Sequence, residues 1–366
     1  MNFKSDNIGS ISSEIVQAII EANKGNQLSY GADDYSLELN KQMSKIFEKD
    51  VIVYLTSTGT AANSLALSAL VKPYEAIYCI NESHINTDEC GAPELFTNGA
   101  RLVLVESDVN GKIDTSFLEG KILASLSRTP HGQRPGCISI TQATECGTVY
   151  SIEELKKIHN IANKYNIPIH MDGARFANSI ATLNCKPAEV TWKVGVDVLC
   201  FGATKNGAMC AEAIVFFNHE YAKNFDYLQK RAGQLMSKTR FFACQFLAYL
   251  EHDLWLKNSE RANSMAKQLT KIFNDHSIEI VYPVESNELF VTFPKDLFEY
   301  LKERKCGFYD WSTSKIRNDL YRFVTSCFTS NDDMLAFNDC LIDYEGQLQN
   351  NKGLTYSQMM TLRREL

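Results

Sequence analysis

Short apolar segments alternate with helical patterns through the first two thirds of the chain. Val, Ile, Leu and aromatic side chains run almost without interruption through residues 51–55, 76–80, 101–106, 137–143, 167–171, 196–201 and 212–217. Apolar strands of this kind, separated by helices, are typical of a mainly parallel sheet that is buried on both faces. We therefore predict an α/β domain with helices on both sides of a central sheet.

Two helices of this region have clear patterns. Residues 60–71 follow an apolar strand directly, and residues 151–166 are amphipathic. The second helix begins at Ser151 and has Glu154 three residues later, which is the pattern of a capping box.

A different pattern begins near residue 220. Long helical segments are predicted at 221–256 and 258–273, followed by strands at 278–282, 288–293 and 320–326, a helix around 297–305 and a final helix. This order predicts a smaller α+β domain. We expect a large domain over 1–250, a small domain over 251–345, and a polar, partly disordered tail over 346–366.

Composition narrows the class of protein. The chain has 366 residues, 45% of them hydrophobic, and a net charge of -7, which argues against nucleic acid as the main partner. We find no signal-peptide pattern and no apolar run of about 20 residues, so we expect no membrane span. The 11 cysteines form no C-x-x-C pair, which favours reduced thiols in a cytoplasmic protein, and the seven histidines show no metal-ligand spacing.

Common catalytic and nucleotide-binding motifs are absent from the sequence. There is no G-x-G-x-x-G, no Walker A sequence, no G-x-S-x-G and no H-E-x-x-H. A large chain of enzyme-like pattern therefore requires a different chemistry.

The segment TSTGTAAN, residues 56–63, is the first of three polar features at the ends of predicted strands. In open α/β sheets, ligands bind at the carboxyl ends of the strands. Backbone N–H groups at the start of the following helix, with the hydroxyls of Thr58 and Thr60 beside Gly59, can hold a phosphate. The alternative is a capped helix without a ligand.

The second feature is IPIHMDGAR, residues 167–175, in which an apolar strand delivers Asp172. A buried carboxylate needs a partner. That partner is either Arg175, in a structural ion pair, or the protonated ring nitrogen of a cofactor.

The third feature is Lys205, which follows the strand VDVLCF and precedes Asn206-Gly207. A buried lysine is rare, and one at a strand end is suited to forming a Schiff base. The alternative is a lysine that extends from a loop into solvent. Phosphate cup, aspartate and lysine in this order are the groups that pyridoxal 5′-phosphate requires.

With these residues the chain resembles the low-specificity L-threonine aldolases and the related β-eliminating lyases of the fold-type I pyridoxal phosphate enzymes. The resemblance rests on the segments FKSDN, SYGADD, TGTAAN, NESHIN, MDGAR and GATKNGAM. It implies a pyridoxal phosphate-dependent transferase-like α/β fold with a small α+β domain. It also implies retro-aldol cleavage of L-threonine or L-allo-threonine to glycine and an aldehyde.

The resemblance also implies roles for individual residues. Thr58, Gly59 and Thr60 would hold the cofactor phosphate, with Arg231 and Lys238 reaching the phosphate of a neighbouring subunit in a homotetramer or dimer. The alternative for Arg231 and Lys238 is a solvated helix face. Ser5, Arg175 and Arg322 would bind the substrate carboxylate, near Tyr30. His84 or His131 would be the base, with His84 favoured for stacking on the ring and His131 for shaping the side of the β-substituent. The segment TQATECGTV departs from the family pattern and is expected to place Gln142 and Glu145 in the site.

Other functions stay open at this point. The enzyme alternative is a β-eliminating lyase or aminotransferase that acts on another amino acid. A cofactor carrier without catalysis would not need the arginines, and a structural protein with a satisfied buried lysine would be colourless.

Overall fold

The computed structural model describes residues 1–311 and 319–352 and contains a large sheet in the order β1-β7-β6-β5-β4-β2-β3. Its strands are β1 (Ile52–Thr56), β2 (Glu75–Ile80), β3 (Arg101–Val105), β4 (Arg134–Thr141), β5 (Ile169–Gly173), β6 (Val198–Gly202) and β7 (Glu212–Phe216). β7 is antiparallel to both of its neighbours, and all the other strands run in one direction. The seven strands predicted from the sequence are confirmed.

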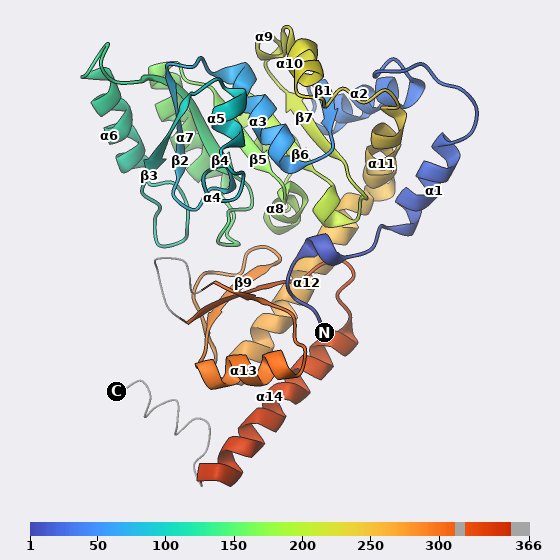
Figure 1. The fold of residues 1–366 in the computed structure, drawn as a ribbon, viewed down its shortest axis with the longest axis vertical. Coiled ribbons are helices and arrows are strands. Elements are labelled where there is room, and N and C mark those ends of the chain that lie inside the picture. Colours follow the sequence, from blue (N-terminus) through green and yellow to red (C-terminus); the bar gives the residue numbers. More distant parts are fainter. Residues whose placement is uncertain (312–318, 353–366) are drawn as a thin grey trace.

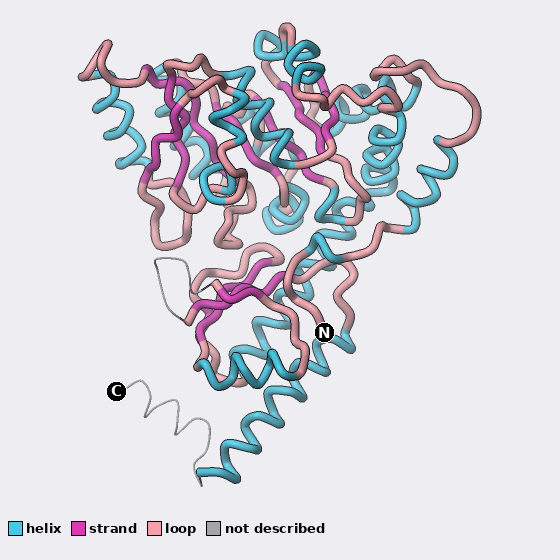
Figure 2. Tube along the Cα trace, viewed as in Figure 1, coloured by secondary structure: helices cyan, strands magenta, loops and turns pink. Residues whose placement is uncertain are grey.

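Helices cover both faces of this sheet (Figures 1 and 2). They are α1 (Ser13–Ala22), α2 (Asp34–Ile46), α3 (Gly59–Leu70), α4 (His84–Thr87), α5 (Ala92–Phe96), α6 (Thr115–Leu126), α7 (Ile152–Tyr165), α8 (Phe176–Leu183), α9 (His219–Ala222), α10 (Phe225–Arg231) and α11 (Arg240–Leu250). α3 packs with β2 and β6 in one apolar core, while α7, α8 and α11 belong to a second. The capping box of α7 is confirmed, because Ser151 accepts from the backbone of Glu154 and Glu154 accepts from that of Ser151.

The small domain is an antiparallel sheet in the order β10-β11-β9-β8, with helices packed against it. Its elements are α12 (Leu254–Asp275), β8 (Glu279–Ile280), β9 (Glu288–Thr292), α13 (Lys295–Glu303), β10 (Tyr309–Asp310), β11 (Leu320–Val324) and α14 (Asn331–Lys352). The prediction of an α/β fold with a smaller α+β unit is thus confirmed.

Two segments connect the large sheet to the small domain. α12 begins in the core of the large domain with Trp255 and ends in the core of the small domain with Phe273. The N-terminal segment also reaches the small domain, because Phe3 is fully buried there and donates its N–H to Gly307 O at 2.6 Å. The expected boundary at residue 250 remains a prediction, but residues 1–4 contact the small domain.

The long helix expected over 221–256 is wrong. The structure contains the end of α9, then α10 and α11, the short 3-10 helix η5 (Glu251–Asp253) and the start of α12 there. Asn224 has a φ of 62°, in the left-handed region, and Gly233 has a φ of 71°, so the backbone cannot continue as one helix through either position. In the expected tail, residues 346–352 belong to α14, and 353–366 lie outside the described residues.

Within residues 1–311 and 319–352, every helix is too short or too polar to cross a bilayer.

Phe201 of β6 is the centre of an aromatic cluster behind the edge that carries the polar features. Its ring is 5.3 Å from that of Phe176, 5.7 Å from that of Phe246 and 5.7 Å from that of Trp255, measured between centroids. Phe201→Ala should lower the free energy of unfolding by about 3–5 kcal/mol, since it leaves a cavity in a rigid core. Denaturant unfolding would measure this. Val109→Ala, at a side chain that is 87% exposed, is the control and should change the value by less than about 0.5 kcal/mol.

Candidate active site

Four strands end at the same edge of the large sheet. β1 is parallel to β4, β5 and β6, since both β1 and β6 are antiparallel to β7. In register, Asp172 of β5 lies between Thr141 of β4 and Cys200 of β6. The three polar features of the sequence therefore converge, as the rule for parallel strand ends predicts.

Lys205 lies in the short 3-10 helix η4 (Thr204–Asn206), immediately after β6. The next residue is anchored, because Asn206 Nδ2 donates to Tyr249 Oη at 2.7 Å. Gly207 follows with a φ of 106°, a conformation that side chains rarely allow. The backbone on the C-terminal side is thus fixed, whereas the Lys205 side chain is half-buried and forms no ion pair with any described residue.

The charge of Lys205 influences carboxyl groups from different parts of the chain. Burial raises the pKa of Glu212 to about 7, and Lys205 partly opposes this rise. Burial acts to raise the pKa of Asp6, but the charges of Arg175 and Lys205, with hydrogen bonds from Arg175 and Asn287, lower it overall. Lys205 is therefore close to the N-terminal segment as well as to the strand ends.

The turn between β1 and α3 has the form expected of a phosphate cup. Thr58 is the N-cap of α3 and its hydroxyl accepts a hydrogen bond from the third helical residue at 3.2 Å. In the described part of the chain, the N–H groups of Gly59 and Thr60 donate to no acceptor, and the space beside the Gly59 Cα is open. Thr58 can therefore cap α3 while the N–H groups of Gly59 and Thr60 remain available to a phosphate.

Asp172 is buried, with 5% of its surface exposed, and it forms no ion pair with a cationic side chain of residues 1–311 or 319–352. Its Oδ2 accepts from Asn63 Nδ2 at 2.8 Å, and its Oδ1 accepts from the N–H of Ala174 at 2.9 Å. The structural ion pair with Arg175 that the sequence left open is not formed. Neutral donors alone leave a place for a cationic ring nitrogen beside this carboxylate.

His84 is joined to Asp172 through two buried side chains. Its Nδ1 lies 2.9 Å from Glu89 Oε1, and Asn63 Nδ2 donates to the same Glu89 oxygen at 2.8 Å and to Asp172. The hydrogen bond with Glu89 raises the pKa of His84 above its usual value. Burial raises the pKa of Glu89.

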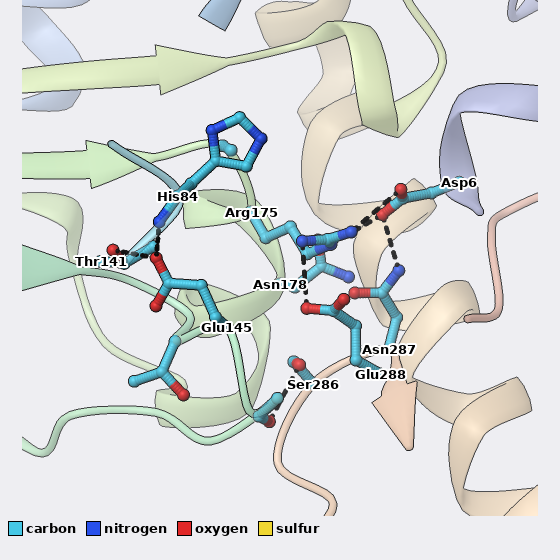
Figure 3. A network of polar contacts seen from close by, with 12 residues as sticks. Asp6, His84, Thr141, Glu145, Arg175, Asn178, Ser286, Asn287 and Glu288 are labelled. Atoms are coloured by element: carbon cyan, nitrogen blue, oxygen red, sulfur yellow. Dashed lines mark hydrogen bonds and ion pairs between the residues drawn. The ribbon is translucent and has the colours of Figure 1, made fainter. Parts of the chain in front are cut away.

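Glu145 is half-buried and lies beside His84, the first residue of α4 (Figure 3). Its Oε1 accepts from the backbone N–H of His84 at 2.9 Å and from Thr141 Oγ1 at 2.7 Å, while its Oε2 has no hydrogen-bond partner. Burial raises its pKa to about 7. Gln142 was expected beside Glu145. Its Nε2 donates to Tyr150 O and its Oε1 accepts from Tyr150 N, both at 2.9 Å.

Arg175 connects the N-terminal segment to the small domain (Figure 3). Its Nε and Nη2 donate to the two carboxylate oxygens of Asp6 at 2.8 and 3.1 Å, and its Nη1 lies 3.0 Å from Glu288 Oε2. Ser5 caps the short helix that carries Asp6, so its hydroxyl accepts from Asn7 N at 3.1 Å.

Arg322 of β11 lies on the opposite side of Glu288. Its Nη1 is 3.7 Å from Glu288 Oε1, and its guanidinium lies over the ring of Trp311 at 4.3 Å from the centroid. The two arginines that the sequence proposed as a pair are therefore brought together, although a glutamate stands between them.

The structure does not bring His131 to this edge. His131 is exposed in the turn before β4, whereas Asp172 pairs with the last residue of that strand. Eight residues of strand span about 26 Å, so within one chain His131 lies at the opposite edge. The loose match that suggested it depended on sequence position alone.

Tyr30, Arg231 and Lys238 are exposed and are not linked to Asp172 or Lys205 by any contact among the described residues. The N–H of Tyr30 donates to Ser237 O at 3.0 Å, and Lys230 lies over its ring. Tyr30 thus contacts Lys230 and Ser237, which are the sequence neighbours of Arg231 and Lys238.

Sequence reasoning missed Asn63, Glu89, Gln234, Asp6 and Glu288. Gln234 Oε1 accepts from both the N–H and the hydroxyl of Ser57 at 3.1 Å, so it fixes the cup from a distant segment. The signal for Asn63 was present in TGTAAN, since a polar side chain one helical turn after Thr60 faces the same way. No local signal marks the others.

The residues fit pyridoxal 5′-phosphate. Among the described residues, the amine of Lys205 forms no ion pair and matches the cofactor aldehyde. Asp172 is a buried carboxylate without a cationic partner in this part of the chain and matches the ring nitrogen. The N–H groups of Gly59 and Thr60, which donate to no described acceptor, match the phosphate.

Residues 2–295 match the family model of the β-eliminating lyases. A low-specificity L-threonine aldolase of Pseudomonas aeruginosa is 42% identical over 308 residues, covering 84% of this chain and 88% of that protein. A threonine aldolase of Leishmania major is similar in structure, with a TM-score of 0.88, 25% identity, and coverage of 94% of this chain and 99% of that one. An aspartate aminotransferase of Thermotoga maritima shares the fold, with a TM-score of 0.71, 16% identity, and coverage of 94% and 91%.

Glu145→Gln should change how stability depends on pH. The folded pKa of Glu145, about 7, lies above its ordinary value of 4.5, so the folded state binds the proton more tightly. This stabilisation is complete below about pH 4.5 and is lost as the pH rises through 7. Relative to the wild type, the variant should therefore gain roughly 3 kcal/mol between pH 4 and pH 8, at about 1.4 kcal/mol per pKa unit.

Urea unfolding at several pH values would measure this gain. Glu153→Gln, on the exposed face of α7, is the control. Parallel stability curves for Glu145→Gln and the wild type would contradict the prediction.

Proposed function

Because the chain belongs to the β-eliminating lyase family, and within it to the low-specificity L-threonine aldolases, we propose that it cleaves L-threonine and L-allo-threonine to glycine and acetaldehyde. The observation that supports this most strongly is the convergence of Lys205, Asp172 and the start of α3 at one edge of the sheet. That edge also faces the Arg175 and Arg322 pair, which suits a substrate with a carboxylate.

We propose that pyridoxal 5′-phosphate is held by this edge. When bound, the cofactor supplies a ring that accepts the electron pair released by bond cleavage at the substrate Cα. Lys205 would hold the aldehyde through its amine, and the N–H groups of Gly59 and Thr60 would receive the phosphate. Asp172 would keep a proton on the ring nitrogen, because an anionic carboxylate in a buried site favours a cation beside it.

His84 is the proposed base for the β-hydroxyl of the substrate. Its Nδ1 is engaged by Glu89 at 2.9 Å, which leaves Nε2 as the nitrogen that can accept a proton. Arg175 and Arg322 would orient the substrate carboxylate, and that orientation decides which bond at Cα is broken.

We also propose that the protein acts in the cytoplasm as a homo-oligomer, either a tetramer or a dimer. Arg231 and Lys238 support this, because both are exposed and neither has an ion-pair partner among the described residues. In an oligomer they would reach the phosphate site of a neighbouring subunit.

The decisive experiment is to incubate the cofactor-loaded protein with L-threonine and to measure acetaldehyde and glycine together. Both products should form in equal amounts. Lys205→Ala should lower the rate by at least about a thousandfold, whereas Lys156→Ala, on the exposed face of α7, should leave it unchanged. If the protein formed pyruvate from β-chloroalanine and no product from threonine, the proposed function would be wrong and the protein would be a β-eliminating lyase.

Glu89→Gln should shift the pH dependence of kcat/KM. The hydrogen bond that Glu89 accepts from His84 Nδ1 is the chief cause of the raised pKa of His84, so its loss lowers that pKa. A base must be unprotonated, so the acid limb of the profile should move to lower pH. His84→Asn should remove the limb, and a limb that is unchanged in both variants would exclude His84 as the base.

A further inference from the structure

The two carboxylates that contact Arg175 do so with different geometry. Asp6 accepts two aligned hydrogen bonds, from Nε at 2.8 Å and from Nη2 at 3.1 Å, and it also accepts from Asn287 Nδ2 at 3.0 Å. Glu288 Oε2 is 3.0 Å from Nη1, yet no hydrogen bond to that oxygen has acceptable geometry. Asp6 is therefore the fixed partner, and Glu288 is an ion pair without directional bonds.

Arg322 repeats this arrangement from the other side. It approaches Glu288 only at 3.7 Å, and its Nε donates to no acceptor in the described part of the chain. The Arg322 side chain is 17% exposed and that of Glu288 only 1% exposed. The guanidinium groups of Arg175 and Arg322 thus face the one buried carboxylate of Glu288. Each guanidinium has N–H groups that form no aligned hydrogen bond with this carboxylate.

We propose that Glu288 occupies the position of the substrate carboxylate and thereby determines how tightly amino acids bind. This inference rests on the proposed function. An incoming substrate carboxylate would displace Glu288 from Arg175 Nη1 and Arg322, while Asp6 keeps the Nε and Nη2 side of Arg175. Glu288 is a specificity-determining residue in this role, since its carboxylate competes with that of the substrate.

The charges of the cluster explain why this competition weakens binding. Arg175 and Arg322 are balanced by Asp6 and Glu288, so the closed cluster offers no net positive charge to an anion. Only the fraction of molecules in which Glu288 has moved away can bind a carboxylate, and the apparent affinity falls by that fraction. Ligands without a carboxylate do not compete with Glu288.

The test compares two ligands on the cofactor-loaded protein. Glycine has both the amine and the carboxylate, and ethanolamine has the amine alone. Glu288→Gln keeps the shape of the side chain and removes its charge, so the dissociation constant of glycine should fall by about tenfold. That of ethanolamine should stay the same. Both constants are measured from the change in absorbance on binding.

The control is Glu75→Gln. Glu75 is also a buried glutamate at the start of a strand and lies 3.7 Å from an arginine, Arg134, but it lies at the opposite edge of the large sheet. This variant should leave both dissociation constants unchanged. An unchanged or weaker affinity for glycine in Glu288→Gln would overturn the proposal, as would an equal gain in affinity for both ligands.

If Glu288→Gln does not fold, the wild-type holoenzyme crystallised with glycine provides the answer. Glu288 should then have left Arg175 Nη1, and a Glu288 that remains there overturns the proposal. If the wild type neither cleaves threonine nor binds glycine, both the proposed function and the Glu288 inference are wrong. A wild type that does both, with no gain for glycine in Glu288→Gln, removes the Glu288 inference alone.

Discussion

The buried carboxylate of Asp172 is the constraint around which the large domain is organised. Removing a carboxylate from water without a cation is costly, and among the residues that the structure describes only Asn63 and the N–H of Ala174 contribute hydrogen bonds to it. Asn63 also donates to Glu89, and Glu89 in turn contacts His84. The hydrogen bonds that begin at Asp172 therefore hold side chains on α3, on α4 and in the segment that follows α4. The cationic ring nitrogen of a bound cofactor would satisfy what the protein alone leaves incomplete.

The carboxylate-binding part of the site has a different origin. Arg175 belongs to the large domain, Arg322 and Glu288 to the small domain, and Asp6 to the N-terminal segment that contacts both. The large sheet therefore positions the groups around Lys205, whereas the contact between domains positions the groups around Arg175. The substrate would be held where these two arrangements meet.

Local patterns were sufficient to predict the sheet, the capping box at Ser151, and the three strand ends that carry the proposed site. Parallel strands bring their ends to one edge, so Thr58, Asp172 and Lys205 could be grouped before any coordinates were known. The same patterns failed over 221–256, where the helical periodicity did not reveal the breaks at Asn224 and Gly233.

Partners that are distant in sequence could not be predicted. Asp6 and Asn287 are 281 positions apart, and nothing near either residue indicates their contact. Glu288 reads as an ordinary strand residue until the register of β9 with β11 places it opposite Val324, on a strand that also carries Arg322. His131 shows the converse error, because its position in the sequence suggested the site and the direction of β4 takes it away.

The contact between Asp6 and the small domain has a consequence for the growing chain during translation. Ribosomal synthesis delivers Asp6 first, then Arg175, and Glu288 and Arg322 last. The strand ends around Lys205 can assemble once the large domain has left the exit tunnel, since domains fold as units during synthesis. Asp6, however, receives its Asn287 partner only after the residues that lead into β9 have also been synthesised. A nascent chain thus assembles the cofactor-binding edge well before the carboxylate-binding pair, so recognition of an amino acid is the last property that the protein acquires.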